Sequence, residues 1–260
     1  MSMLADKTII VTGSARGVGR AIAERCAGHG ARLILADILE ELGQKTAAEL
    51  RAAGADARFV PLDLGDPASI DRFAADIAGR EAVVHGLVNN AAIATNVGGK
   101  NFDAIEMELW DRVMRVNVRG TWLVTRAIVP LMPTGGTHES GRYDAGGRIV
   151  NLASDTALWG APRLLAYISS KGAVMAMTRG LARELGPSGI GICAVAPGIM
   201  RNEATDYVPA ARHQEYESGR AVPGVQFPED ITEAIAFLLT PGALALTGQV
   251  LPVDAGFVFT

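Results

Sequence analysis

Short apolar runs alternate with longer helical patterns along the whole chain, and this alternation restricts the possible folds more than any other feature. The runs that read as strands are residues 7–13, 31–37, 57–63, 82–92, 147–154, 190–198 and 248–254. The segments with helical periodicity are residues 17–29, 39–53, 66–79, 106–118, 120–132, 164–186 and 228–239. Uninterrupted apolar strands that alternate with helices are typical of a parallel sheet covered on both faces. We therefore predict an α/β fold, a single doubly wound domain over residues 1–260 with a seven-stranded parallel sheet.

Two segments stand outside this alternation. Residues 133–147 are polar and rich in glycine, and we expect a surface loop there. Whether this loop covers a binding cleft, forms a subunit contact or has neither role stays open at this point. Residues 199–227 are too long for an ordinary connection. Because long connections in compact domains are commonly functional, we expect residues 199–227 to act as a lid over a substrate site.

Composition and charge exclude several classes of partner. The net charge is −4, and the lysines and arginines are not clustered, which argues against a nucleic-acid or anionic-membrane surface. No apolar run approaches the roughly 18 residues of a membrane span, and the amino terminus has no signal-peptide pattern. Cys26 and Cys193 are expected to be buried and unreactive, which suits the cytoplasm. The four histidines are scattered without metal-ligand spacing, so no metal site is predicted.

The segment TGSARGVG (12–19) joins the first predicted strand to the first predicted helix. Its glycines, Gly13, Gly17 and Gly19, allow a tight turn and a close approach of the backbone to a pyrophosphate. The start of the helix adds free N–H groups and a partial positive charge. An ordinary strand–helix turn is the alternative, but the position directly after a first strand favours a dinucleotide site.

The second predicted strand ends at Asp37, about 20 residues after the glycine turn, where an acidic side chain can bind the adenosine ribose of NAD. The same carboxylate would repel the additional phosphate of NADP, by about 4 kcal/mol per unit charge at about 4 Å and an effective dielectric constant near 20. Arg16 favours NADP if it pairs with that phosphate. The alternative interpretation is that the side chain of Arg16 is solvated. We predict NAD, with NADP as the less favoured cofactor.

These motifs belong to a series that runs along the chain. The series comprises TGSARGVG, Asp37, LDL (62–64), NNAA (89–92), VNVRG (116–120), Ser154, YISSK (167–171), APG (196–198) and TGQVLPVDAGF (247–257). In this order and spacing the chain resembles the short-chain dehydrogenase/reductase family over essentially its whole length. The resemblance implies a Rossmann-type fold, and it implies a homotetramer, with a dimer left open.

The resemblance also implies a role for individual residues. Asn117, Ser154, Tyr167 and Lys171 match the catalytic tetrad of the family. The implied cofactor contacts are Gly13, Ser14, Arg16, Gly17, Val18, Gly19, Asp37, Ile38, Asp63, Leu64, Asn90, Ala91, Ala92, Tyr167, Lys171, Pro197, Gly198, Ile199, Met200 and Asn202. Three positions depart from the family pattern without removing a group that the reaction needs. These are Ala92 and Ala255, where the family usually has glycine, and Asn202, where it often has threonine.

Tyr167 and Lys171 are four residues apart on a predicted helix and therefore share one face of it. A free tyrosine has a pKa of about 10. A nearby ammonium, together with the cationic nicotinamide, is expected to lower the pKa of Tyr167 toward working pH. Ser154 ends the fifth predicted strand and is expected to hold the substrate oxygen. The resemblance has Asn117 kink its helix and help to hold a proton-relaying water near Lys171.

The predicted function is an NAD-dependent oxidoreductase that interconverts a secondary alcohol and its ketone, with Tyr167 as general acid and base. One alternative is an NADPH-dependent reductase of a 3-oxoacyl thioester or similar ketone, which Arg16 favours and Asp37 opposes. A non-catalytic dinucleotide-binding regulator is the other alternative, and the intact tetrad argues against it.

The substrate is not determined by the sequence. Leu158, Trp159, Met200 and Tyr207 either form an apolar wall for the alcohol or pack in the core. The arginines of residues 199–227 either bind an anionic substrate or face solvent, and the acidic residues beside them favour solvent. The arginines are Arg201, Arg212 and Arg220, and the acidic residues are Glu203, Asp206, Glu215 and Glu217.

Overall fold

The computed structural model describes residues 2–136 and 144–260. Its seven strands form one sheet in the order β3-β2-β1-β4-β5-β6-β7, and every neighbouring pair is parallel. The strands are β1 (Thr8–Thr12), β2 (Arg32–Asp37), β3 (Ala57–Pro61), β4 (Gly86–Asn89), β5 (Arg148–Leu152), β6 (Gly191–Pro197) and β7 (Val250–Val253). The strand order reverses between β1 and β4, and sheets of this kind bind ligands beyond the carboxyl ends of their strands at such a point. The predicted seven-stranded parallel sheet is confirmed.

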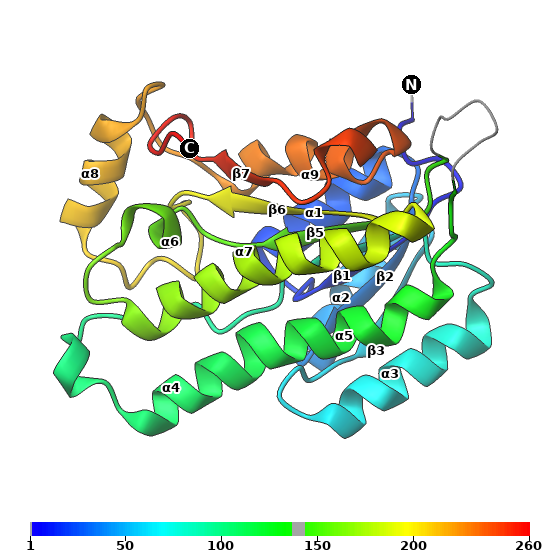
Figure 1. Cartoon of the computed structure of the whole chain (residues 1–260), viewed down its shortest axis with the longest axis horizontal. Helices are drawn as coiled ribbons and strands as arrows, with labels where there is room; N and C mark the ends of the chain where they lie inside the picture. Colours follow the sequence, from blue (N-terminus) through cyan, green and yellow to red (C-terminus); the bar gives the residue numbers. More distant parts are fainter. Residues whose placement is uncertain (1, 137–143) are drawn as a thin grey trace.

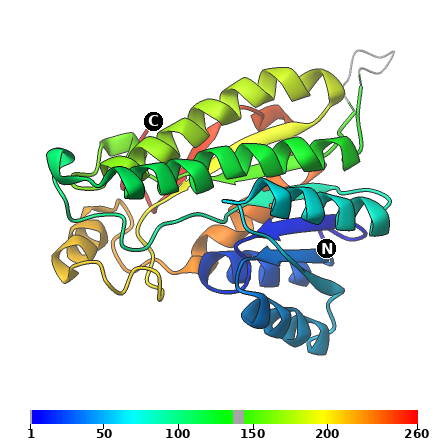
Figure 2. The ribbon, with the colours of Figure 1, turned by 90° about the horizontal axis from the view of Figure 1, so that it is seen from below.

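Helices cover both faces of the sheet (Figures 1 and 2). They are α1 (Gly17–Gly28), α2 (Glu40–Ala52), α3 (Pro67–Arg80), α4 (Met107–Met114), α5 (Thr121–Ile128), α6 (Thr156–Trp159), α7 (Leu165–Leu185), α8 (Ala210–Gly219) and α9 (Thr232–Leu238). Successive side chains of a strand point to opposite faces. Ile9 and Val11 accordingly pack with α1, α2 and α9. Ile10, between them, packs with α3, α5 and α7. Every residue of β1 is buried, as expected for a central strand covered on both sides.

The chain between residues 106 and 132 differs from the prediction of two separate helices. A π-helical turn (Arg115–Gly120) joins α4 to α5 directly, so one helix runs through the segment. Gly120 lies within this helix and is its contact point with the loop after β3. A Cβ atom at Gly120 would lie 2.6 Å from the carbonyl oxygen of Leu64. Glycine is needed there for close approach.

Residues 199–227 contain a helix, α8, that the sequence pattern did not predict. Only His213 and Tyr216 of this helix are buried. Two such side chains on a short polar segment give no apolar periodicity. α6 and α8 both lie at the end of the molecule toward which the strands point, on the left in Figure 1.

The ends of the 133–147 segment lie at the amino ends of β5 and β6. The backbone N–H of Gly135 donates to the carbonyl of Ser188 at 2.7 Å, and that of Gly146 donates to the carbonyl of Gly189 at 2.9 Å. Residues 137–143, the middle of the predicted surface loop, lie outside the described residues. Within the described ranges, no helix is long and apolar enough to cross a membrane.

Candidate functional site

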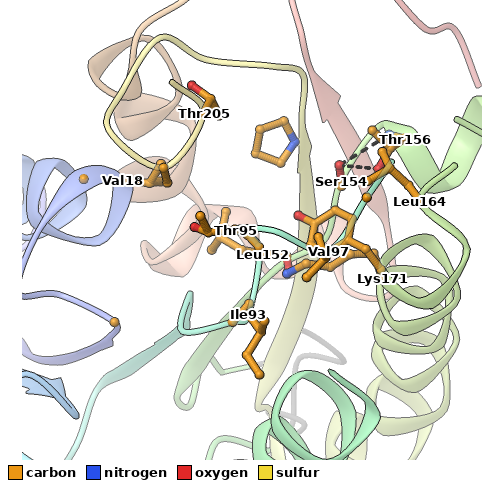
Figure 3. Close-up of a pocket in the computed structure, with 18 of the residues that line it drawn as sticks. Val18, Ile93, Thr95, Val97, Leu152, Ser154, Thr156, Leu164, Lys171 and Thr205 are labelled. Atoms are coloured by element: carbon orange, nitrogen blue, oxygen red, sulfur yellow. Dashed lines mark hydrogen bonds between the residues drawn. The ribbon is translucent and has the colours of Figure 1, made fainter. Parts of the chain in front are cut away.

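A cleft of about 1380 Å³ opens at the carboxyl ends of the strands, where the loops after β1 to β6 converge. The glycine turn forms one part of it, and Ser154 and Lys171 lie in another (Figure 3). Of the residues predicted to bind the cofactor or to catalyse the reaction, all but two line this cleft. The sequence motifs, which are far apart along the chain, therefore meet in one place.

Ser14 and Asn117 are the two predicted site residues that do not line the cleft. Ser14 is fully buried, and its hydroxyl donates to the carbonyl of Ala36 at 3.4 Å. Asn117 is also buried, in the π-helical turn. Its Oδ1 accepts the N–H of Ile93 at 2.8 Å, and its Nδ2 donates to the carbonyl of Ile93 at 3.1 Å. Asn117 thus fixes the backbone of a residue that does line the cleft, while the side chain of Ser14 faces the core.

The glycine turn has the shape of a cradle for an anionic group. Gly13 and Gly17 have φ angles of +66° and +54°, which L side chains rarely adopt. A Cβ atom at Gly19 would lie 2.0 Å from the carbonyl oxygen of Gly13. No side chain caps the first turn of α1, whose N-cap residue is Arg16. The first N–H groups of α1 are thus available to an anion, so these residues fit the pyrophosphate of a dinucleotide.

Asp37 lies at the end of β2 beside the glycine turn. Its Oδ2 accepts the N–H of Ala15 and its Oδ1 accepts the N–H of Leu39, both at 3.0 Å. The carboxylate is therefore held in place by backbone groups on either side. Arg16 forms an ion pair with Glu203 at 3.6 Å, and both side chains are about half exposed.

Asn90 fixes the loop after β4 against the glycine turn. Its Nδ2 donates to the carbonyls of Thr12 and Gly13 at 2.9 and 3.0 Å. In return, the Oγ1 of Thr12 accepts the N–H groups of Asn90 and Ala91. Asn90 therefore holds the backbone of the glycine turn in place.

Ser154, Tyr167 and Lys171 come from the loop after β5 and from the first turns of α7. The Oγ of Ser154 and the Oγ1 of Thr156 are hydrogen-bonded at 2.7 Å, as Figure 3 shows. The Nζ of Lys171 donates to the carbonyl of Leu152 at 2.7 Å and lies 5.7 Å from the centre of the Tyr167 ring. Lys171 is only 4% exposed, and burial lowers its pKa from 10.5 to about 8.

The pKa of Tyr167 is raised above its ordinary value, opposite to the direction expected from the sequence. Burial of the phenol is the main cause, and the charge of Asp155 acts in the same direction. The hydrogen bond with Ser154 lowers the pKa, but by less. Burial therefore favours the protonated form of Tyr167 over the phenolate.

Asp155, Tyr216 and Trp159 form a hydrogen-bonded chain that the sequence did not reveal. The Nε1 of Trp159 donates to the Oη of Tyr216, and this Oη donates to the Oδ1 of Asp155, both at 3.0 Å. Asp155 is fully buried, and its Oδ2 has no hydrogen-bond partner among the described residues. Burial raises the pKa of Asp155 to about 7. The available signal was an acidic residue directly after Ser154.

Residues 199–227 are attached to both sides of the cleft. The Oη of Tyr207 donates to the carbonyl of Ala94 at 3.0 Å, while Tyr216 reaches Asp155 and Glu203 reaches Arg16. Asn202 is bonded within the segment, because its Oδ1 accepts the N–H of Ala204 at 2.8 Å. Residues 199–227 therefore span the cleft from one side to the other.

The arginines of this segment are paired or buried. Arg201 pairs with Glu217 at 2.8 Å and Arg212 with Glu215 at 3.0 Å. Arg220 is 4% exposed and donates to the carbonyl of Ile199. These contacts favour a structural interpretation over anion binding.

The apolar residues predicted for the substrate wall divide into two groups. Trp159, Met200 and Tyr207 line the cleft. Leu158 does not, because it packs on the cluster of Ala153 and Met175. Among the described residues, no group of histidine, cysteine and acidic side chains could hold a metal ion.

A sequence model of a protein family, described as enoyl-(acyl carrier protein) reductase, matches residues 13–258. The chain belongs to the short-chain dehydrogenase/reductase family. It is 36% identical to a sorbitol dehydrogenase of Cereibacter sphaeroides, over 97% of this chain and 98% of that protein. It is 34% identical to a cyclopentanol dehydrogenase of Comamonas testosteroni, over 99% of both chains. The resemblance found in the sequence motifs is confirmed.

Solved structures agree with this assignment. A dehydrogenase/reductase from Sinorhizobium meliloti superposes with a TM-score of 0.87 at 30% identity, over 99% of this chain and 98% of that one. A short-chain dehydrogenase/reductase from Brucella melitensis, described as a glucose/ribitol dehydrogenase, gives a TM-score of 0.88 at 28% identity, over 99% of both chains. As a short-chain dehydrogenase/reductase, the protein is an oxidoreductase that uses a nicotinamide dinucleotide.

Proposed function

We propose that the protein is an NAD-dependent dehydrogenase that interconverts a secondary alcohol and its ketone. The observation that carries this proposal is the meeting of Ser154, Tyr167 and Lys171 with the glycine cradle in a single cleft. The names of the related proteins support an alcohol as the substrate, since they include sorbitol and cyclopentanol dehydrogenases. We assign Asn117, Ser154, Tyr167 and Lys171 as the catalytic tetrad.

The cradle and the adjoining loops hold the cofactor in this proposal. The first N–H groups of α1 bind the pyrophosphate, Asp37 binds the adenosine ribose, and Lys171 binds the nicotinamide ribose. Pro197 and the residues that follow it flank the nicotinamide. When bound, NAD⁺ supplies the acceptor for the hydride that leaves the carbinol carbon.

Proton transfer is the task of Tyr167. The Oγ of Ser154 holds the substrate oxygen by a hydrogen bond, and Tyr167 takes the hydroxyl proton as the hydride departs, which leaves the ketone. In the reverse direction Tyr167 returns the proton. The Nζ of Lys171 is held near Tyr167 by the carbonyl of Leu152. Its positive charge favours the phenolate of Tyr167 and so opposes the effect of burial. Asn117 positions the Ile93 backbone at the edge of the site.

The choice of NAD over NADP rests on Asp37. Its carboxylate is held by two backbone N–H groups and cannot easily turn away from an added phosphate. At about 4 Å and an effective dielectric constant near 20, each unit of negative charge on that phosphate is disfavoured by about 4 kcal/mol. Arg16, the residue that would favour the NADPH-linked reductase, is already paired with Glu203.

Titration of the protein with NADH and then with NADPH, followed by nicotinamide fluorescence, tests the cofactor assignment. We expect NADH to bind at least about tenfold more tightly, which corresponds to about 1.4 kcal/mol. Tighter binding of NADPH would replace the proposed function with ketone reduction. If neither cofactor binds, the proposed enzyme activity is wrong.

The remaining parts of the proposal concern organisation. We propose a single domain in which residues 199–227 act as a lid, working in the cytoplasm as a homotetramer. Exposed apolar side chains on α4 and α5, Met107 and Trp122, support association through this pair of helices. The mass of the particle in solution, measured by light scattering, distinguishes a tetramer from a dimer.

A further inference from the structure

The substrate side of the cleft is built from three segments: the loop after β4, the residues around α6, and residues 199–216. Their apolar contribution includes Ile93, Val97, Leu164 and Met200. Figure 3 shows Ile93, Val97 and Leu164 in the same pocket as Ser154 and Lys171. The character of the site thus depends on what the polar side chains of these segments do.

The aromatic side chains of the wall use their polar atoms elsewhere. The indole N–H of Trp159 donates to Tyr216, and the hydroxyl of Tyr216 donates to the buried carboxyl of Asp155. The hydroxyl of Tyr207 donates to the carbonyl of Ala94. Each ring is therefore anchored through its polar atom, and a ligand meets the apolar part of these side chains.

The other polar side chains of the wall are engaged in the same way. The hydroxyl of Thr205 donates to the carbonyl of Met200. The guanidinium of Arg212 lies 5.2 Å from the centre of the Trp159 ring and pairs with Glu215 at 3.0 Å. Thr95 and Arg163 are exposed to water. The Oδ2 of Asp155 has no partner among the described residues, but this atom is itself buried. These side chains therefore offer no free donor or acceptor to a second substrate hydroxyl deep in the cleft.

The hydroxyl pair of Ser154 and Thr156 is different. The two oxygens are 2.7 Å apart and share one hydrogen bond, so the second hydroxyl proton remains for Tyr167 or for a substrate oxygen. This pair stands beside Tyr167, at the place where the reacting oxygen binds in the proposed function. The site thus offers polar contacts to one substrate oxygen and apolar contacts to the rest of the molecule.

We infer that the substrate is a secondary alcohol, or the matching ketone, whose carbon skeleton bears no polar group besides the reacting oxygen. This inference rests on the proposed function and narrows its substrate to apolar alcohols, such as alicyclic ones, rather than polyols. A further hydroxyl pressed against this wall loses its water and gains no partner. The sorbitol dehydrogenase relative acts on a polyol by its name, so the inference separates this chain from that relative.

Binding of matched ring alcohols tests the inference without requiring turnover. Cyclohexanol and 1,2,3-cyclohexanetriol have the same ring and differ only in added hydroxyls. Each is titrated into the protein saturated with the more tightly bound of NADH and NADPH, and nicotinamide fluorescence reports the complex. We expect cyclohexanol to bind about 10- to 100-fold more tightly than the triol, the range in which an apolar pocket rejects an added hydroxyl. Equal or tighter binding of the triol, or no binding of cyclohexanol, overturns the inference.

Oxidation rates with NAD⁺ separate this inference from the proposed function. If the protein prefers cyclohexanol in binding but oxidises no alcohol, the apolar character of the site is supported and the proposed function fails. If it oxidises sorbitol with a kcat/KM equal to or above that for cyclohexanol, the proposed function holds and the inference fails.

Tyr216→Phe tests whether the hydrogen-bonded chain of Trp159, Tyr216 and Asp155 causes the preference for an apolar alcohol. The variant keeps the ring, which stacks on Phe257 with centroids 4.1 Å apart, but frees the N–H of Trp159 and the carboxyl of Asp155. We expect the preference for cyclohexanol over the triol to decrease by about threefold or more, since a freed donor can bind a hydroxyl. Ser218→Ala removes an exposed hydroxyl from the same helix and serves as the matched control. An unchanged preference in Tyr216→Phe contradicts the assigned cause.

Discussion

We expect the buried carboxyl of Asp155 to make the free energy of unfolding decrease as the pH rises. Burial raises the pKa of Asp155 from 3.8 to about 7, with a smaller contribution from the charge of Asp254. The hydrogen bond from Tyr216 and the charge of Arg220 act against this increase. Between about pH 4 and pH 7 the folded protein therefore holds a proton that the unfolded chain has lost. By linkage, the contribution of Asp155 to the free energy of unfolding falls as the pH rises through this interval.

The difference between 3.8 and about 7 corresponds to about 4 kcal/mol, because each pH unit is worth about 1.4 kcal/mol. Asp155→Asn removes this titration and keeps an acceptor for the hydroxyl of Tyr216. The asparagine of the variant does not titrate, and its amide occupies the site of Oδ2 at a cost that is the same at every pH. We thus expect the stability of the variant, relative to the unmodified protein, to increase by about 4 kcal/mol between pH 4 and pH 8.

Urea denaturation at a series of pH values measures this difference. The free energies of unfolding of the two proteins are compared at each pH, so that other titrating groups cancel. Asp71→Asn, which removes an exposed carboxylate of α3, is the control for a change in surface charge. Parallel curves for Asp155→Asn and the unmodified protein would refute the reasoning, because they would mean that Asp155 is ionised in both states.

Three further predictions concern the cofactor and the reaction. Tyr167→Phe should lower kcat by about 10²- to 10⁴-fold, since a proton-transfer group is lost, with the affinity for NADH kept; a variant with full activity in steady-state assays would remove Tyr167 from the mechanism. Asp37→Ser should reduce the preference for NADH over NADPH by about 10- to 1000-fold, and an unchanged ratio in fluorescence titrations would mean that other groups select the cofactor. Gly19→Ala should abolish NADH binding, because its Cβ atom would lie 2.0 Å from the carbonyl oxygen of Gly13. Gly79→Ala on α3 has open space and should raise the stability by up to about 1 kcal/mol; NADH binding by Gly19→Ala equal to that by Gly79→Ala contradicts the close contact.

The strands and the cleft were accessible from the sequence because their signals are local. β1 and β6 are buried throughout, and β2 is buried from Leu33 onward, so their apolar runs are continuous. The glycine turn is marked by its own residues, and the i,i+4 spacing of Tyr167 and Lys171 follows from helix geometry. In these cases neighbouring residues carry the information.

The features that the sequence did not predict depend on contacts between distant parts of the chain. The sequence predicted two helices, over residues 106–118 and 120–132, whereas a π-helical turn joins them into one. The contact that requires glycine at position 120 is with Leu64, which is remote in sequence. The chain from Asp155 to Tyr216 joins residues 61 positions apart. The expected decrease in the pKa of Tyr167 took account of the nearby lysine, but burial, which only the folded structure reveals, is the larger cause.

The π-helical turn between α4 and α5 touches two loops of the cleft at once. Within it, Asn117 binds the backbone of Ile93, and Gly120, three residues later, lies against the backbone of Leu64. One turn of helix therefore sets the spacing between the loop after β3 and the loop after β4. Residues 199–227 are attached across the cleft largely through side chains such as Tyr207 and Tyr216. We therefore expect substitutions in residues 199–227 to change the choice of substrate while the spacing of the two loops is kept.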